Sequence, residues 1–511
     1  MKETHAILEK NKEPSVKALL IYPEFPDTFW SFRYALKFIS RKASSPPLGL
    51  LTVAAMLPEA WEIKLVDMNV ESLYDDDLRW ADLVLVSAMS VQKESVITVL
   101  ARCKAVGVRT VAGGPLFSTE YETFGEVDHL VLNEAEITLP RFLNDFQNGV
   151  AGHFYATDQW ADIDQTPIPL WRLITTKRYA SINIQYSRGC PLNCEFCDIF
   201  LLCGRTPRTK DKDQIIRELE SVYAYGFRGQ VFFVDDNFIG NKKKLKEEIL
   251  PAIIDWTERR KHPFSFNTQA SIELSDHEDL MQLMVRAGFD VVFIGIETPH
   301  DQSLAECGKF QNKNRDLLAS IRKIQQSGIE VQGGYIVGFD SDPLSIFDTQ
   351  IRFIQESGVV TAMVGILIAL SRTKLYERLK KEQRLLKPTS GNNTDFATNF
   401  IPRMGYDPLV NGYKKVLKTI YSPKYFYERV RTFLRVYNPP KKKTNAFWLR
   451  LNYLAAFFRS VFVLGVIGKE RFHYWKLVFW TMFTRPRLLP QAITFAIYGY
   501  HFRKTFEKRV G

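Results

Sequence analysis

The sequence has 511 residues, of which 46% are hydrophobic and 24% charged, values that suit a globular protein long enough for three domains. Six cysteines over this length do not indicate a disulfide framework, and the polar N-terminus lacks the apolar core of a signal peptide, so we expect a cytoplasmic rather than a secreted protein. The net charge of +11 is uneven, because residues 441–511 carry 14 Lys and Arg against two acidic residues, which favours an anionic partner for that region.

The N-terminal third predicts a Rossmann-like domain. Residues 1–15 are polar and are predicted to be a disordered lead, and the domain is expected over residues 16–150. Within it, short apolar runs alternate with segments of helical length; the runs lie at 16–22, 63–67, 83–87, 110–113 and 130–132. This alternation is typical of a doubly wound parallel sheet, an α/β fold that binds ligands beyond the carboxyl ends of its strands.

A second strand–helix series follows. Residues 151–180 contain the Pro-rich stretch TPIP and are predicted to be a linker, and residues 181–386 form the second domain. Its predicted strands lie at 181–185, 230–234, 265–269, 291–296, 331–337 and 364–368, with helices such as 212–225 and 315–326 between them. The alternation fades after residue 387, and residues 387–511 are predicted to be a mainly helical C-terminal domain.

The second domain contains a three-cysteine motif. The stretch SRGCPLNCEFCDIF has C-x3-C-x2-C spacing and supplies Cys190, Cys194 and Cys197. Three thiolates can hold three irons of a [4Fe–4S] cluster and leave the fourth iron open for chemistry. Zinc is the alternative, but structural zinc takes four ligands, usually in two spaced pairs, and Cys203 is the only other candidate ligand within ten residues. The spacing therefore favours the cluster.

With the aromatic Phe196 before the last cysteine, the motif resembles that of the radical S-adenosylmethionine (SAM) enzymes. The resemblance implies a partial (β/α)6 barrel over residues 181–386, with SAM bound at the open iron. It also implies a low-potential electron donor of the ferredoxin or flavodoxin type, and cleavage of SAM to a 5'-deoxyadenosyl radical that abstracts hydrogen from substrate. The sequence does not single out a further catalytic side chain.

Polar residues and glycines at strand ends are candidates for the SAM site. The run VFFVDDN places Asp235 and Asp236 at the carboxyl end of a strand, where barrel active sites form, although a helix cap or a solvated turn is the alternative. Asn267 and Gln269 share one face of the next strand and either face the pocket or fill a polar barrel interior. By resemblance, Phe196 and four residues of the IGIET and GYIVGFD stretches join this SAM-binding set: Glu297, Gly334, Ile336 and Gly338.

The first domain resembles the cobalamin (B12)-binding domains that precede some radical SAM cores. Its Ser-Ala-Met and Gly-Gly elements match parts of that signature, which makes cobalamin-binding candidates of Ser87, Met89, Gly113 and Gly114. The loop after the first strand, PEFPDTFWSF, lacks the histidine that usually ligates cobalt from below. The resemblance implies that this loop, Tyr22–Trp30, meets the lower face of the cofactor instead.

The two domains together imply a cobalamin-dependent radical SAM C-methyltransferase. Across its length the chain is similar to the group that includes hopanoid C-2 methylase, in stretches such as YPEFPDTFWSF, FVDDNFIGN and AIYGYHF. We therefore predict methylation of an unactivated carbon in an apolar substrate, with a hopanoid lipid as one candidate. A radical SAM cyclase, oxidase or rearrangement enzyme without methyl transfer is the alternative, and an iron–sulfur protein that binds nucleic acid is the least favoured.

The basic C-terminal region carries 17 aromatic residues within residues 441–511. Three interpretations stay open: a helical domain whose aromatic residues form its own core, a helical surface that lies on an anionic membrane, and a nucleic-acid surface, which is the least favoured. The longest apolar stretch is too short to span a bilayer. The second interpretation predicts peripheral attachment to the inner face of the cell membrane.

Overall fold

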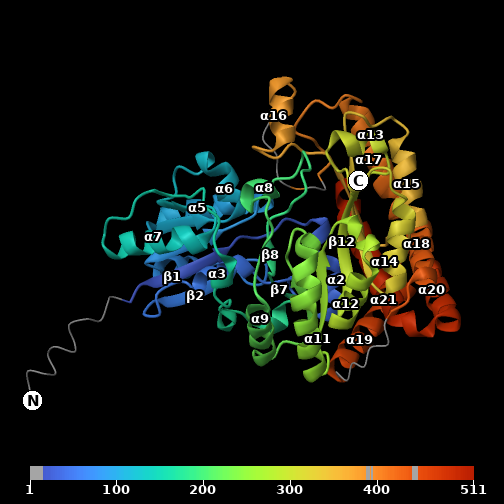
Figure 1. The fold of residues 1–511 in the computed structure, drawn as a ribbon, viewed down its shortest axis with the longest axis horizontal. Helices are drawn as coiled ribbons and strands as arrows, with labels where there is room; N and C mark the ends of the chain where they lie inside the picture. Colours follow the sequence, from blue (N-terminus) through green and yellow to red (C-terminus); the bar gives the residue numbers. More distant parts are fainter. Residues whose placement is uncertain (1–14, 387–391, 393–394, 440–446, 511) are drawn as a thin grey trace, which may run out of the picture. The chain divides into compact units, whose positions relative to one another are not determined.

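A computed structural model describes residues 15–386, 392, 395–439 and 447–510 (Figure 1). The predicted disordered lead lies outside the described residues except for Ser15, as does the run 441–446. The chain divides into two compact units, one of Met1–Pro26 and Pro46–Thr175 and the other of Asp27–Ser45 and Thr176–Gly511. The short segment Asp27–Ser45 thus belongs to the second unit, although it lies inside the predicted first domain.

The first unit is a doubly wound parallel sheet of six strands in the order β2-β1-β3-β4-β5-β6. Its strands are β1 Lys17–Tyr22, β2 Glu62–Asp67, β3 Leu83–Ser87, β4 Arg109–Gly113, β5 His129–Val131 and β6 Phe154–Tyr155. Its helices include α3 Leu48–Ala54, α4 Asp75–Trp80, α5 Lys93–Val106, α6 Pro115–Glu120 and α7 Ala135–Gln147. The predicted Rossmann-like fold is confirmed, and β6 adds an edge strand from within the predicted linker.

The second unit contains another sheet of six parallel strands, in the order β14-β13-β12-β11-β10-β7. These strands are β7 Ser181–Ile184, β10 Gly229–Phe233, β11 Phe264–Gln269, β12 Phe289–Glu297, β13 Glu330–Val337 and β14 Ala362–Ile366. The helices between them include α9 Lys212–Ala224, α11 Leu250–Arg259, α12 Glu278–Ala287, α14 Leu317–Ser327 and α15 Ile346–Ser357. Each of the six predicted strands overlaps an observed one, so the expected (β/α)6 series is present.

Local signals set the boundaries of the helices in this unit. The Asp211 carboxylate accepts a hydrogen bond from the N–H of Gln214 at 2.6 Å at the start of α9, and Asp316 caps α14 in the same way. Gly288 and Gly328 follow α12 and α14 in the left-handed conformation, with φ of +110° and +102°. These glycines end the two helices, and the chain continues directly into β12 and β13.

The two faces of the second sheet differ in burial. Phe233, Phe266 and Val292 are fully buried, while Phe232, Asn267 and Phe293 on the same strands are only half-buried. Because successive strand residues point to opposite faces, one face packs against the helices and the other stays accessible. We call the accessible face, which also carries Met363 on β14, the inner face of the sheet.

The C-terminal domain is helical and packs beside the barrel helices (Figure 1). It includes α16 Lys374–Lys381, which lies before the predicted boundary at residue 387. Its other elements are α17 Tyr406–Ile420, α18 Pro423–Val436, α19 Phe447–Ser460, the π-helix η11 Val461–Ile467, α20 Arg471–Thr484 and α21 Leu489–Val510. Both α17 and α18 pack on α15. Among the described residues, we find no helix whose length and apolar character would let it cross a membrane.

Candidate active site

One loop carries all three cysteines of the motif. It runs from β8 (Ser187–Arg188) to the short helix α8 (Ile199–Leu202) and begins at Gly189, whose φ is +96°. A Cβ atom at Gly189 would lie 2.7 Å from the carbonyl oxygen of Thr206, so only glycine fits this conformation and this close approach. The next residue, Cys190, donates its backbone N–H to the Gly204 carbonyl at 3.2 Å, which closes the loop on itself.

The three thiols form a donor set that fits a cluster. Burial raises the pKa of Cys190, Cys194 and Cys197, and the charges of Asp198 and of the other two cysteines raise the pKa of Cys197 further. No three His, Cys, Asp or Glu side chains in the described part of the chain converge on the position of one metal ion. A [4Fe–4S] cluster binds each thiolate through a different iron, and its irons supply the positive charge that buried thiolates need.

A second loop, after α13 (Asp301–Glu306), supports the cysteine loop and was missed in the sequence analysis. The Glu195 N–H donates to the Cys307 carbonyl at 2.8 Å, and Lys309 forms a buried ion pair with Glu297. Burial lowers the pKa of Lys309, but the charges of Glu297 and Cys194 outweigh this effect and raise the pKa above its usual value. Lys309 therefore remains protonated and adds positive charge beside the cysteines. No motif or residue spacing in the sequence points to Lys309.

The adjacent carboxyl groups of Asp235 and Asp236 have different surroundings. Asp235 has no exposed surface and accepts hydrogen bonds from the N–H groups of Tyr186 and Ser187 and from the Ser187 hydroxyl, just before the cysteine loop. Burial raises its pKa to about 7. Asp236 lies on the half-buried side of the chain, and burial followed by the charge of Asp198 raises its pKa to about 6. Asp235 therefore orders the loop, and the predicted SAM contact is better suited to Asp236.

Asn267 and Gln269 both lie on the inner face of the sheet, alternating with buried Phe266 and Thr268. The Oδ1 atom of Asn267 is buried and has no hydrogen-bond partner in the described structure. A buried carbonyl oxygen without a partner costs free energy, which a bound ligand with a donor group can recover. Asn267 is therefore suited to a polar ligand, and its predicted contact with SAM stays a prediction.

The remaining predicted SAM residues meet the cysteine loop at the end of β13. Phe196 and Ile336 pack against the same buried cluster, and the rings of Phe196 and Phe339 have centroids 6.3 Å apart. Gly338 has a φ of +105° and donates its N–H to Asp342 at 2.9 Å, so this glycine is required by a turn. The space above Gly334 is filled by Phe293, because a Cβ there would lie 2.7 Å from that ring. The predicted contact of these residues with SAM stays a prediction.

A network of charges ties the cysteine loop to the C-terminal domain. Arg378 on α16 donates to Glu195 at 2.7 Å and to Asp340, the residue that follows the β13 turn, at 2.8 Å. Arg384 also binds Asp340, and these hydrogen bonds outweigh the effect of burial and hold the pKa of Asp340 below its usual value. Two loops that are far apart in the sequence are thereby fixed together.

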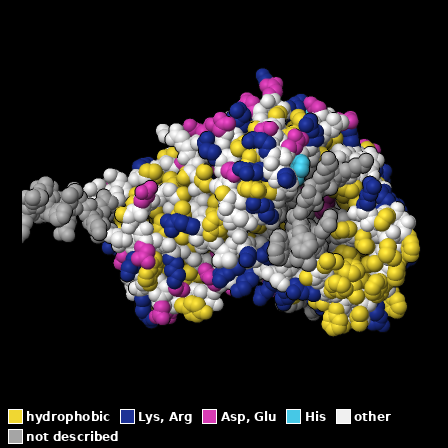
Figure 2. Space-filling view, turned by 90° about the horizontal axis from the view of Figure 1, so that it is seen from below, with side chains coloured by type: hydrophobic (Ala, Val, Ile, Leu, Met, Phe, Trp, Pro, Cys, Tyr) yellow, Lys and Arg dark blue, Asp and Glu magenta, His cyan; other side chains and the backbone are white. Residues whose placement is uncertain are grey.

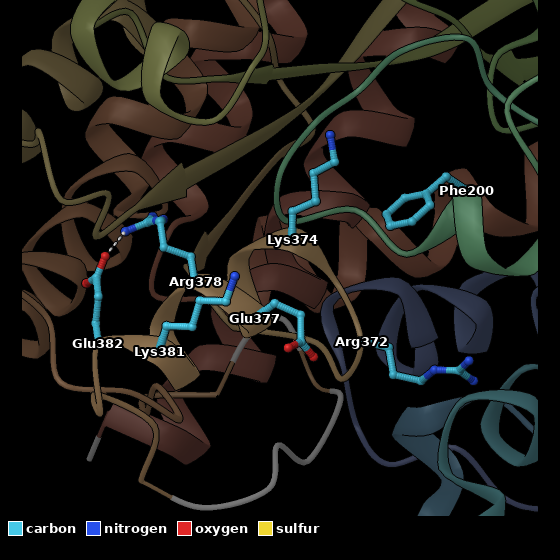
Figure 3. A pocket seen from close by; sticks show the side chains of 7 residues that line it. All are labelled: Phe200, Arg372, Lys374, Glu377, Arg378, Lys381 and Glu382. Atoms are coloured by element: carbon cyan, nitrogen blue, oxygen red, sulfur yellow. Dashed lines mark hydrogen bonds and ion pairs between the residues drawn. The ribbon is translucent and has the colours of Figure 1, made fainter.

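A pocket of about 570 Å³ opens beside this network (Figure 3). Its walls come from α8, α16 and the turns next to α16, and it is lined by Phe200, Arg372, Lys374, Glu377, Arg378, Lys381 and Glu382. The Lys374 ammonium donates to the Asn193 side chain in the cysteine loop at 2.6 Å. The surface next to the three cysteines is therefore predominantly basic.

The candidates for cobalamin binding gather at the carboxyl ends of β3 and β4 in the first unit. Ser87 pairs with Gly113 in the parallel register, and a Cβ at Gly114 would collide with the Ser87 hydroxyl. Gly114 also has a φ of +89°, a conformation that favours glycine. Met89 is half exposed in the following turn. This edge is where doubly wound sheets bind ligands, so the placement suits the predicted role, which stays a prediction.

Comparisons with known proteins place this arrangement in a family. Three family profiles match in succession: the B12 binding domain over residues 37–143, the radical SAM superfamily over residues 184–354, and a domain of unknown function over residues 373–510. An uncharacterised methyltransferase of Synechocystis sp. is 40% identical over 95% of this chain and 91% of its own length. Hopanoid C-2 methylase of Rhodopseudomonas palustris is 30% identical over 91% of this chain and 89% of its own length.

Solved structures show the same fold. The cobalamin-dependent SAM radical enzyme OxsB, with aqua-cobalamin and SAM bound, matches 97% of this chain and 80% of its own at a TM-score of 0.61 and 16% identity. The radical SAM methyltransferase TsrM from Kitasatospora setae, with cobalamin and a [4Fe–4S] cluster bound, matches 97% of this chain and 99% of its own at a TM-score of 0.61 and 14% identity.

The chain belongs to the family of cobalamin-dependent radical SAM methyltransferases. It is a radical SAM enzyme, and its cofactors are a [4Fe–4S] cluster, SAM and cobalamin. The predicted family, fold class and cofactors are thus confirmed.

Proposed function

We propose that this enzyme transfers a methyl group to an unactivated carbon of an apolar substrate, with a polycyclic hopanoid lipid as the first candidate. The observation that carries the proposal is that one chain combines the three-cysteine loop with a cobalamin-binding domain and matches two methyltransferases over nearly all of their length. When bound, the cluster and SAM supply a hydrogen-abstracting radical, and methylcobalamin supplies the methyl group.

The substrate class is supported by the inner face of the second sheet. Phe232, Phe293 and Met363 present apolar surface there, while Asn267 and Gln269 provide a polar strip on the neighbouring strand. A substrate without polar groups is positioned by the shape of its pocket. An apolar wall next to the polar residues that are predicted to bind SAM therefore suits such a substrate. Hopanoids enter as candidates because the relative from Rhodopseudomonas palustris is a hopanoid C-2 methylase.

The proposal is tested with anaerobically reconstituted enzyme given cobalamin, a reductant, a pentacyclic hopanoid and SAM labelled in its methyl group. We expect labelled methyl in the lipid, together with 5'-deoxyadenosine and S-adenosylhomocysteine, and we expect the last product only when cobalamin is present. Omitting cobalamin is the control. Formation of 5'-deoxyadenosine alone, with no S-adenosylhomocysteine, would contradict methyl transfer and favour the cyclase, oxidase or rearrangement reading.

We also propose that the electron donor is an acidic, low-potential protein of the ferredoxin or flavodoxin type. Lys374 and Lys381 on α16 and Arg372 in the preceding turn line the pocket, and Lys374 hydrogen-bonds the cysteine loop. Opposite charges steer such encounters and weaken as salt screens them. In the assay above, turnover with reduced flavodoxin should therefore fall as salt rises, whereas turnover with a small uncharged reductant should not.

The C-terminal helices expose a broad apolar surface (Figure 2). We call this surface the apolar patch, which consists of Leu454, Phe458, Phe462, Val466, Ile467, Phe472, Phe479, Met482 and Phe483. Phe472 and Phe483 are 76% and 80% exposed. Residues 447–510 contain only two acids, and both are ion-paired, Glu470 with Arg503 and Glu507 with Lys504. Large exposed apolar patches mark interaction surfaces, and a basic surround suits an anionic bilayer.

We propose that the apolar patch attaches the enzyme peripherally to the inner face of the cell membrane. Replacing both Phe472 and Phe483 by Ser should weaken binding to vesicles that contain phosphatidylglycerol by at least about tenfold, because burying each ring contributes about 1.5–3 kcal/mol. Vesicle co-sedimentation measures this. Tyr406→Ser, at an exposed aromatic residue on α17, is the matched control and should bind as the wild type does. Equal binding of all three proteins would overturn the proposal.

A further inference from the structure

The segment Asp27–Ser45 is held at its C-terminal end by the first strand of the second sheet. The Lys42 N–H donates to the Arg178 carbonyl at 2.8 Å, and the Ser181 N–H at the start of β7 donates to the Ser44 carbonyl at 2.8 Å. An isolated parallel bridge between Ala43 and Tyr179 lies between these two hydrogen bonds, so the segment runs alongside residues 178–181. The segment therefore packs as an integral part of the second unit and is more than a linker between the two units.

Its other end is held by α21, the last helix of the chain. Phe29 is fully buried, and its ring stacks on Phe502 with centroids 4.2 Å apart and an interplanar angle of 4°. The His501 ring donates from Nε2 to the Phe29 carbonyl at 3.0 Å and stacks on Phe32 at 5.3 Å. Burial lowers the pKa of His501 to about 4, so the ring is neutral near pH 7 and donates as a fixed tautomer.

A second C-terminal helix holds the middle of the segment. Arg459, at the end of α19, donates to the Phe38 carbonyl at 2.8 Å and to the Ser40 hydroxyl at 2.8 Å. These are hydrogen bonds from a charged group, which are stronger than neutral ones. The C-terminal domain thus contacts the segment at two separate points, one through α21 and one through α19.

Trp30 ends the Tyr22–Trp30 loop that was predicted to meet the lower face of cobalamin, and its ring lies on the inner face of the second sheet. Its ring meets Phe293 edge to face, with centroids 5.5 Å apart, and its Nε1–H donates to the Met363 sulfur at 3.1 Å. Phe293 is in register with Gln269 on β11, so Trp30 lies near the strip of polar residues predicted to bind SAM. Despite these contacts, 36% of Trp30 remains exposed.

We propose that the C-terminal helical domain serves to hold residues 27–45 against the barrel, and that Trp30 is a substrate-positioning residue whose indole contacts the apolar substrate. The second part rests on the proposed function above. An apolar molecule offers no hydrogen bonds for orientation, so a rigid aromatic wall must fix which carbon faces the cofactors. A misplacement of 1 Å costs a rate factor of about 10².

Three Leu substitutions separate the parts of the proposal. Trp30→Leu removes the wall, Phe502→Leu removes the stacked anchor, and Phe433→Leu is the control. Phe433 is a buried ring on α18 that packs on Tyr437 and on Phe495 of α21, so this control removes a ring beside the same helix but keeps the stack of Phe502 on Phe29. Hydrogen exchange of residues 27–45 reports the anchor, and the ratio of methylated hopanoid to 5'-deoxyadenosine reports the positioning of the substrate.

We expect amide exchange in residues 27–45 to be at least tenfold faster in Phe502→Leu, unchanged in Phe433→Leu, and faster in Trp30→Leu only next to Trp30, whose contacts with Phe293 and Met363 are lost. The ratio of methylated product to 5'-deoxyadenosine should fall at least tenfold in both Trp30→Leu and Phe502→Leu, and it should stay at the wild-type value in Phe433→Leu. Wild-type exchange in Phe502→Leu would overturn the anchoring role. A wild-type ratio in Trp30→Leu would overturn the positioning role.

A binding measurement keeps this inference separate from the proposed function. A pentacyclic hopanoid is titrated into enzyme without SAM or reductant, and the indole fluorescence change is compared between the wild type and Trp30→Leu. A change that Trp30→Leu abolishes supports the substrate contact even if no methyl transfer is found, in which case only the proposed reaction fails. The same change in both proteins, or none in either, would overturn the contact.

Discussion

Replacing Cys194 by Ala is expected to remove the cluster and reduce SAM cleavage to the uncatalysed background. Cys194 is the middle cysteine of the loop and is only 8% exposed. Three thiolates hold three irons of the cluster, so the loss of Cys194 leaves one of these irons without its protein ligand. We expect iron content to fall from about four per chain to near zero, with no 5'-deoxyadenosine formed, while far-ultraviolet circular dichroism remains unchanged.

Cys203→Ala is the matched control for this experiment. Cys203 lies six residues after Cys197, and its backbone N–H donates to the Ile199 carbonyl at 2.8 Å, a hydrogen bond that alanine preserves. We expect this variant to keep its iron and its SAM cleavage. Retention of the cluster in Cys194→Ala would show that the loop is not the cluster site, and loss of iron in Cys203→Ala would make Cys203 a ligand.

Replacing Lys309 by Met is expected to lower the free energy of unfolding by about 3–5 kcal/mol, because it leaves the Glu297 carboxylate buried without its partner. The two side chains are only 10% and 8% exposed. Removing both charges in Lys309→Met with Glu297→Gln should recover most of the loss, since no buried charge is then left unpaired. Urea unfolding of the reconstituted enzyme, followed by circular dichroism, measures each variant.

An exposed ion pair provides the comparison for this effect. Arg259 and Asp255 form an ion pair on α11 with side chains 66% and 68% exposed, and Arg259→Met should cost less than about 1 kcal/mol. If Lys309→Met cost no more than Arg259→Met, the buried pair would not stabilise the site. Glu297 forms the ion pair with Lys309 and is also predicted to contact SAM. The single variant Glu297→Gln separates these two roles: if it binds SAM more weakly and Lys309→Met does not, Glu297 contacts the ligand directly.

The sequence by itself determined the order of the elements and the chemistry of the central loop. Most of the parallel strands are short runs rich in apolar residues, and helices such as α9 and α12 begin or end on a local signal, Asp211 and Gly288, so periodicity and turn residues sufficed for these elements. The three cysteines lie within eight residues of one another, which is why their spacing identified the cluster before any fold was known.

Only the tertiary structure decided how distant segments meet around that loop. Arg378 contacts Glu195 across 183 residues, and His501 contacts Phe29 across 472 residues. The difference between Asp235 and Asp236 has the same origin, because the donors of Tyr186 and Ser187 reach only the first of these adjacent carboxyl groups. Local patterns record a residue's own conformational preference and hydrophobicity. Which side chains become partners depends on packing that brings strand ends and helices together, and a single sequence carries no periodic signal for it.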